Sequence, residues 1–399
     1  MAESLSAGAL RLALYSGLCV RHDAISNGLR LKLDAADQWR AAGSDVAATG
    51  FVHHIDDDDP RVLVVDRVSS LLRIPQFRAA NVHVFEFGIY YPLFDAVFVV
   101  PDEASVVGVY HNVTPPALAD DPDARAVLER SLVQRHNLSR ANHVVTHSDY
   151  SREELLALGF DAERVSVITL PPSAGIGGQP VPDRRAAGPV KLLYVGRFVR
   201  SKGVLDLLDA VASLRSATSH PFELALAGNP RLSSVAVLDE VRKRCDGELS
   251  GVARVVLAPN EAALSGLYAE SDVFVIPSYH EGYCVPVVEA LASGCHVVAY
   301  DSSNLPFVLS GLGSLVATGD VTMLTKALAE SIARFALARN GTAPLRVHTT
   351  RGDLEEAVWR EAIRVHLDGC SEVAFQERWR AVLESVVAQR ADRTPAGVR

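Results

Sequence analysis

The stretch Ser271–Asp301, SDVFVIPSYHEGYCVPVVEALASGCHVVAYD, joins an apolar run, a polar loop and a helical pattern to a second apolar run. It predicts a strand over Val273–Ile276, a helix over Val287–Ser293 and a strand over His296–Ala299. Strand, helix and strand in this order are typical of a parallel β/α unit. The loop before the helix is therefore expected at the carboxyl end of a strand, where the exposed N–H groups of the helix favour an anionic or oxygen-rich ligand.

Two carboxylates bracket this loop. Glu281 lies in it, and Glu289 follows after seven intervening residues, at a position that we place in the first turn of the helix. Pro286 presets the backbone for the start of a helix. Carboxylates accept paired hydrogen bonds from the hydroxyls of a sugar or a ribose, and an acid at a helix N-terminus is expected to stay ionised. For Glu289 the alternative is a charge that only stabilises the helix.

The same alternation runs along the whole chain and predicts an α/β fold with two doubly wound Rossmann-like domains that face an interdomain cleft. The first domain covers residues 1–175 and the second residues 188–370, with a Pro- and Gly-rich linker over 171–189. An amphipathic helix over 372–392 is expected to pack back on the first domain. Strands of the first domain are predicted at Asn81–Glu86, Ala96–Val100, Val106–Tyr110, His143–Thr146 and Val165–Thr169.

Composition narrows the class of protein. The chain has 399 residues and a formal net charge of −9, which argues against a surface built to bind nucleic acid and weakens the case for anionic lipid. Five scattered cysteines without CxxC spacing indicate neither a disulfide framework nor a zinc site. No signal-type segment or membrane-length apolar run occurs. We therefore expect a cytoplasmic protein with at most peripheral membrane contact.

A second chemical segment is KLLYVGRFVRSKGVLDLLDAV, residues 191–211. It predicts a buried strand that ends at Gly196, where the missing side chain lets a ligand approach the backbone. Arg197 and Lys202 follow and place two cations near a helix N-terminus, a combination that suits a diphosphate. Taken alone, the two cations are explained better as surface charges at a βα turn.

Together these segments resemble the retaining glycosyltransferases of the family-4 type (glycosyltransferase group 1), which have the GT-B fold. The resemblance is clearest over residues 140–335. It rests on Glu281-Gly282-Tyr283 followed by Pro286 and Glu289, which is similar to the Glu-x7-Glu motif of that family. The Gly196-Arg197 pair with Lys202-Gly203 is a second element, and THSDYSREELLALG at residues 146–159 is a third.

The resemblance implies roles for single residues. Glu289 would bind the ribose of the nucleotide, Glu281 the donor sugar, and Arg197 and Lys202 the leaving diphosphate. Backbone N–H groups would complete the diphosphate site, which adds Gly282, Tyr283, Cys284 and Val285 to the binding residues. Cys284 stands where the family usually has Gly, so its backbone is less free to take a positive φ.

In the first domain the resemblance concerns two positions. In GVYHNVTPP, residues 108–116, His111 ends a strand at a position where family members use a His close to the donor sugar. Gly17, in the loop after the first strand, corresponds to one of the paired glycines that approach the donor phosphates. A structural His at a strand end is the alternative for His111.

The implied function is transfer of a hexose-type sugar from a nucleotide sugar to an acceptor hydroxyl with retention of anomeric configuration, in bacterial glycan or natural-product biosynthesis. The acceptor would be a sugar, a lipid-linked molecule or a natural product. The leaving diphosphate would help to deprotonate it, so no cofactor and no metal are expected. The one metal-like tract, HHIDDDDP at residues 53–60, is explained more simply as an acidic surface loop.

Three alternatives remain at this stage. A helper subunit of a partner transferase, or a nucleotide-sugar epimerase, would share the fold and some of the acidic residues. A glycan phosphorylase would need a lysine for pyridoxal phosphate, and of the five lysines only Lys202 is well placed. A dehydrogenase is excluded by the absence of a GxGxxG motif.

Overall fold

The structure is a computed structural model that describes residues 9–20, 23–177 and 188–393. The described residues form two compact units. Unit 1 draws on residues 1–113, 126–169 and 373–399, and unit 2 on residues 114–125 and 170–372. Each is considered by itself. Residues 178–187 of the predicted linker lie outside the described residues.

Unit 1 is built on a seven-stranded parallel sheet of order β5-β3-β1-β6-β7-β8-β9. Its central strands are buried on both faces, as expected for a parallel sheet covered by helices. The strands are β1 (Leu10–Tyr15), β3 (Val46–Val52), β5 (Val62–Val64), β6 (Val82–Phe87), β7 (Ser105–Tyr110), β8 (His143–Thr146) and β9 (Val165–Val167), and a small parallel pair is formed by β2 (Leu18–Cys19) and β4 (His54–Ile55).

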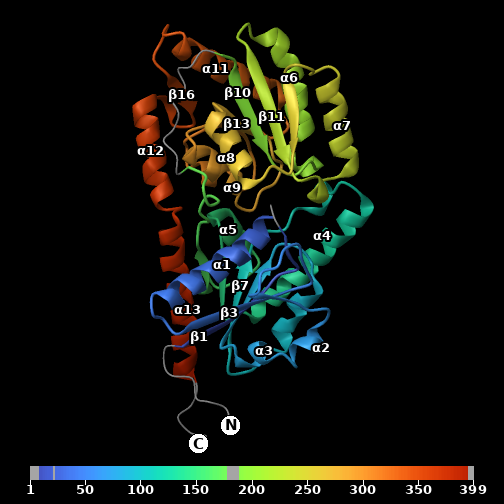
Figure 1. Cartoon of the computed structure of the whole chain (residues 1–399), viewed down its shortest axis with the longest axis vertical. Helices are drawn as coiled ribbons and strands as arrows, with labels where there is room; N and C mark the ends of the chain where they lie inside the picture. The colour runs from blue at the N-terminus through green and yellow to red at the C-terminus, as the bar shows by residue number, and fades with distance from the viewer. Residues whose placement is uncertain (1–8, 21–22, 178–187, 394–399) are drawn as a thin grey trace, which may run out of the picture. The chain divides into compact units, whose positions relative to one another are not determined.

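The last helix, α13 (Glu372–Arg393), packs on unit 1 beside α1 (Ala24–Ala41) (Figure 1). The Arg380 guanidinium lies 5.5 Å from the ring of Trp39, and the Ser105 hydroxyl donates to the carbonyl of Val386. The other helices are α2 (Val68–Leu71), α3 (Pro75–Ala79), α4 (Pro122–Gln134), which both units share, and α5 (Asp149–Ala157), with 3-10 turns η1 (Pro92–Phe98), η2 (Pro116–Leu118), η3 (Arg135–Arg140) and η4 (Ala162–Arg164).

Unit 2 has a six-stranded parallel sheet of order β12-β11-β10-β13-β14-β15. Figure 1 shows α6 and α7 beside β10 and β11. The strands are β10 (Val190–Val195), β11 (Phe222–Gly228), β12 (Ala253–Leu257), β13 (Val273–Ile276), β14 (His296–Asp301) and β15 (Ser314–Ala317), and a hairpin is formed by β16 (Arg346–Thr349) and β17 (Gly352–Glu355). The helices are α6 (Val204–Ala217), α7 (Val235–Asp246), α8 (Glu261–Glu270), α9 (Val285–Ala292), α10 (Leu305–Leu309), α11 (Val321–Arg339) and α12 (Glu356–Asp368), with η5 (Arg200–Lys202) and η6 (Pro230–Leu232).

One predicted strand is wrong. Residues 96–98 of the expected strand Ala96–Val100 belong to η1, which begins at Pro92 and buries Leu93, Phe94, Ala96 and Val97. A short apolar run does not distinguish a buried helical turn from a strand, and Pro92 favours the turn. By contrast, β8 has the predicted bounds, and β6 and β7 differ from prediction by one residue at their ends.

Both sheets contain a point at which the strand order reverses. In unit 2 it lies between β10 and β13, and in unit 1 between β1 and β6. In open α/β sheets ligands bind outside the carboxyl ends of the two strands that flank such a point. Residues that directly follow these strands are therefore the first candidates for a functional site.

Candidate functional site

The switch point of unit 2 brings together the two segments that the sequence singled out. Gly196, Arg197 and Lys202 follow β10, and Glu281 follows β13. These strands are hydrogen-bonded neighbours, with Leu192 aligned with Val273. Lys202 and Glu281, which are 79 positions apart along the chain, thus lie at the same edge of the sheet.

Lys202 and Glu281 form an ion pair at this edge. The Lys202 ammonium lies 2.7 Å from Glu281 Oε1, and the two side chains are 15% and 10% exposed. Lys202 also donates to the carbonyl of His280, and the Ser278 hydroxyl donates to Glu281 at 2.8 Å. Burial and the nearby ammonium lower the pKa of His280 to about 4, so this ring is neutral near pH 7. The pair places a fixed cation and a fixed carboxylate where a charged ligand would bind.

A close contact at Gly203 holds this arrangement. Gly203 has a φ of +62°, and a Cβ at this position would lie 1.8 Å from the carbonyl oxygen of Pro277, directly after β13. Only glycine allows this approach in this conformation. Gly203 thereby sets how near Lys202 comes to the loop that carries Glu281.

Three consecutive polar residues after β14 hold the same loop by its backbone. The Ser302 hydroxyl donates to the carbonyl of Ser278, and the Asn304 amide donates to the carbonyl of Tyr283 at 2.8 Å. Between them, Ser303 Oγ accepts from the N–H of Glu281 at 2.7 Å. The sequence analysis missed these residues, because Ser and Asn after a strand are ordinary loop formers and their partners lie about 20 residues away.

The residues from Gly282 to Val285 lead into α9. Cys284 is buried and has φ 75° and ψ 67°, so it takes the positive φ for which it is less free than a glycine. A non-glycine residue in this region costs about 1–3 kcal/mol, and such residues cluster at functional sites. Val285 is the first residue of α9. Two residues earlier, the Tyr283 hydroxyl donates a hydrogen bond to the carbonyl of Leu170.

Glu289 differs from the prediction in two respects. It is the fifth residue of α9 rather than a first-turn residue, and it is buried with 4% exposure. Burial raises the pKa of its carboxyl, which opposes the expectation that the helix N-terminus keeps it ionised. The N–H of Ser173 donates to Glu289 Oε1 at 3.3 Å.

Gly196 and Arg197 lie beside the ion pair at the end of β10. A Cβ at Gly228, which ends β11, would lie 2.3 Å from the carbonyl oxygen of Gly196, so the two glycines let these strand ends approach closely. Gly228 was not among the predicted site residues. Arg197 is exposed. Its long cationic side chain therefore remains accessible to a ligand at this edge.

The predicted residues of unit 1, His111 and Gly17, lie at the carboxyl edge of its sheet. His111 directly follows β7, and its Nε2 is 2.6 Å from Glu86 Oε2. Gly17 follows β1, and a Cβ there would lie 3.0 Å from Cβ of Tyr91. Glu86 was missed as a functional candidate because it was read only as the end of a strand.

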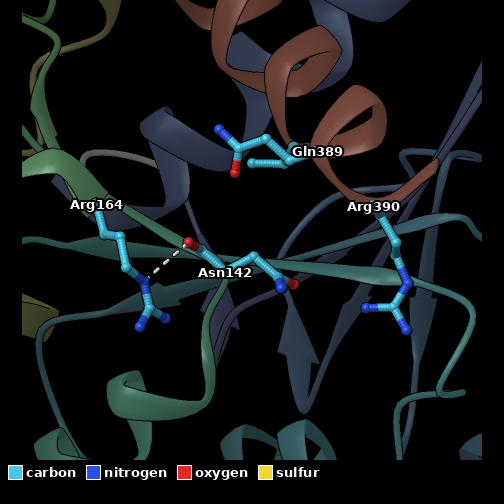
Figure 2. A pocket seen from close by; sticks show the side chains of 5 residues that line it. Asn142, Arg164, Gln389 and Arg390 are labelled. Carbon is cyan, nitrogen blue, oxygen red and sulfur yellow. Dashed lines mark hydrogen bonds between the residues drawn. The ribbon is translucent and has the colours of Figure 1, made fainter. Parts of the chain in front are cut away.

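Figure 2 shows a pocket of about 120 Å³ elsewhere in unit 1, lined by Asn142, Arg164, Val386, Gln389 and Arg390. Asn142 and Arg164 directly precede β8 and β9. This pocket is therefore at the amino ends of the strands, at the opposite edge from His111. The Arg164 guanidinium is used there to bind the carbonyls of Ala141 and Asn142.

Within the described residues, no group of three or more His, Cys, Asp and Glu side chains has the arrangement of a metal site. In the acidic tract at residues 53–60, Asp57 pairs with Arg30 and Asp59 with Arg61. None of the helices in the described part of the chain is long and apolar enough to cross a membrane.

Residues 189–334 match the profile of the family described as glycosyl transferases group 1. This segment contains both halves of the site at the switch point of unit 2. This part of the chain is therefore similar to the group 1 glycosyl transferases. The family resemblance expected from the Glu-x7-Glu pattern is thereby confirmed.

Curated relatives align with about half of the chain. The O-antigen chain mannosyltransferase B of Escherichia coli is 27% identical over 213 residues, which are 51% of this chain and 55% of that protein. The D-inositol 3-phosphate glycosyltransferase of Corynebacterium jeikeium is 29% identical over 206 residues, 48% of each chain. The chain thus spans about half the length of the curated relatives it matches.

Solved structures match nearly the whole chain in fold. Sucrose-phosphate synthase from Thermosynechococcus elongatus has a TM-score of 0.70 at 19% identity, over 95% of this chain and 100% of that chain. Anabaena HepE, solved with UDP and glucose, has a TM-score of 0.67 at 14% identity, over 94% and 100%. Similarity at this level concerns the fold, and it confirms the predicted GT-B class.

Proposed function

We propose that this protein is a nucleotide-sugar-dependent glycosyltransferase that moves a hexose-type sugar to an acceptor hydroxyl. The observation that carries the proposal is the Lys202–Glu281 ion pair at the switch point of unit 2, inside the segment that matches the family. The pair offers a cation for a diphosphate and a carboxylate for sugar hydroxyls within 2.7 Å of each other. Few ligands other than a nucleotide sugar require both.

The remaining residues of unit 2 fit parts of the same donor. Arg197 is accessible for a second phosphate contact, and a cation there stabilises the diphosphate as charge builds on it during departure. The buried Glu289 suits a ribose, because a carboxyl that is shielded from water gains more stabilisation from hydrogen bonds with ribose hydroxyls than an exposed carboxyl does. UDP is the first nucleotide to test, since HepE was solved with UDP and glucose.

We further propose retention of anomeric configuration, with the leaving diphosphate accepting the proton of the acceptor hydroxyl. This mechanism needs no protein carboxylate as base and no metal ion. The relatives named for O-antigen mannosyl transfer and D-inositol 3-phosphate make a sugar or cyclitol hydroxyl the first acceptor class to try.

The proposal is tested with a panel of UDP- and GDP-sugars, measured by thermal shift and by release of the nucleoside diphosphate. The parent, Glu281→Ala and Glu289→Ala are compared with Glu261→Ala, which removes an exposed acid from α8 of the same unit. We expect one donor class to stabilise the parent and the Glu261 variant but not the Glu289 variant. Absence of a shift with every donor would favour a helper subunit instead.

A further inference from the structure

A buried charged contact in unit 1 connects three elements to the residue at the end of β7. Lys32 comes from α1, Glu86 from β6 and His111 from the residue after β7. The Lys32 ammonium lies 2.8 Å from Glu86 Oε1, and His111 Nε2 lies 2.6 Å from Glu86 Oε2. The single carboxylate therefore contacts a cation with one oxygen and an imidazole with the other.

The burial of this contact is complete at its centre. The side chains of Lys32 and Glu86 are 0% exposed, and that of His111 is 8% exposed. Helix α13 encloses the lysine, with its ammonium 5.8 Å from the ring of Phe375 and 5.4 Å from the ring of Trp379. Charged side chains are rarely buried this fully unless they are paired, and removing one partner leaves an uncompensated buried charge.

The charge of Glu86 determines which nitrogen of His111 carries the proton. Burial opposes ionisation of Glu86, but Lys32 and His111 together lower its pKa below the ordinary value, so it is a carboxylate. An ionised carboxylate only accepts hydrogen bonds. Nε2 of His111 must then carry the hydrogen, and in a neutral ring Nδ1 is left as an acceptor.

A second histidine packs against the ring of His111. Besides Lys32 and Glu86, the titratable group packed against it is His147, whose ring centroid is 4.8 Å away. Burial lowers the pKa of His147, which keeps that ring neutral. Asn112, the next residue, has a φ of 73°, a conformation that is costly for a non-glycine residue and typical of functional sites.

We propose that Lys32 and Glu86 are positioning residues that hold His111 in its Nε2–H tautomer, so that Nδ1 accepts a hydrogen bond from a sugar hydroxyl. This inference rests on the proposed glycosyl transfer. Lys32 acts through Glu86 by keeping it ionised, and Glu86 acts through His111. Helix α13 contributes to this arrangement, because the rings of Phe375 and Trp379 enclose the Lys32 ammonium.

Two double variants separate positioning from packing. Lys32→Met with Glu86→Gln removes both charges but keeps an oxygen that accepts the Nε2 hydrogen. Lys32→Met with Glu86→Leu removes the charges and the acceptor. Neither variant leaves an unpaired buried charge, so both are expected to fold. The tautomer is measured by NMR on protein with 15N-labelled histidine, with the His111 signals assigned from their loss in His111→Gln.

We expect the Nε2–H tautomer in the parent, a weaker preference for it in the Met/Gln variant, because a neutral amide can donate as well as accept, and loss of the preference in the Met/Leu variant. Turnover should fall in both variants, less in the first than in the second, where we expect a loss of about 100-fold, the scale of a misplaced site group. A Met/Leu variant with the parent tautomer and parent turnover would overturn the inference. If the parent turned over no donor, the proposed function would be refuted. The tautomer measured by NMR would then decide by itself whether Lys32 and Glu86 position His111.

Discussion

The contact between Gly203 and Pro277 allows a quantitative prediction. In Gly203→Ala the new methyl would lie 1.8 Å from the Pro277 carbonyl oxygen, so the backbone must move by at least about 1 Å to restore an ordinary contact. An alanine at positive φ costs about 1–2 kcal/mol, and the forced displacement adds about 1–3 kcal/mol. The same displacement draws Lys202 away from Glu281.

Gly251→Ala is the matched control. Gly251 lies in the same unit with a φ of +77°, but a Cβ there meets no atom within 4 Å. This variant therefore carries the backbone cost alone. In a unit of about 200 residues each kcal/mol lowers Tm by about 2–4 °C, so Gly203→Ala should melt about 2–12 °C below Gly251→Ala.

The assay is calorimetric melting of both variants, followed by donor titration below the transition. Only Gly203→Ala should also lose donor affinity, because only that position adjoins the ion pair. Equal Tm values and equal donor affinities for the two variants would refute the reasoning that close packing at Pro277 sets the geometry of the site.

Three further predictions concern the same unit. The raised pKa of Glu289 means that the folded state binds a proton more readily than the unfolded chain, so the contribution of Glu289 to stability falls as pH rises above the ordinary glutamate pKa. In urea unfolding, the free energy of unfolding of Glu289→Gln minus that of the parent should therefore be larger at pH 7 than at pH 4. The nucleotide affinity of the variant should drop. Ser303→Ala removes the acceptor for the Glu281 N–H at a cost of about 1–3 kcal/mol and should raise the donor KM. Ser310→Ala is the control, because Ser310 has a similar positive φ of 48°, and it should leave the donor KM unchanged. Equal KM values for the two variants would contradict the role of Ser303. EDTA should leave turnover unchanged, and a requirement for added divalent ions would contradict the metal-free mechanism.

The strands and the motif could be predicted because they depend on local patterns. The apolar run of β8 and the strand-loop-helix order around Glu281 are visible in a few consecutive residues. The run at residues 96–100 was not predictable in this way, since its apolar residues fit a helical turn equally well. Local pattern thus determines the element only where length and flanking residues agree.

The contacts that organise the site could not be predicted, because they join residues far apart in the chain. Lys32 was dismissed among the lysines, and its partner Glu86 is 54 positions away. A signal did exist: Glu86 is an acid inside the otherwise apolar strand VHVFEF. A charged residue in a strand that is buried throughout requires a buried partner, and this argument could have directed attention to the three other charged or imidazole groups of unit 1 that meet there.

The two glutamates of the Glu-x7-Glu pattern have different environments, and this difference argues for different roles. Glu281 is compensated at close range by the Lys202 ammonium and the Ser278 hydroxyl, so its charge is supported without a ligand. Glu289 is more deeply buried, receives the Ser173 N–H and has a raised pKa. Ligand hydroxyls that donate to Glu289 would therefore favour its ionised form, so binding at this position is coupled to proton release. At Glu281 a ligand hydroxyl must instead share a carboxylate that already pairs with Lys202. This contact restrains the position of the ligand more than it adds to its affinity. We accordingly expect Glu289 to contribute mainly to donor binding and Glu281 mainly to turnover.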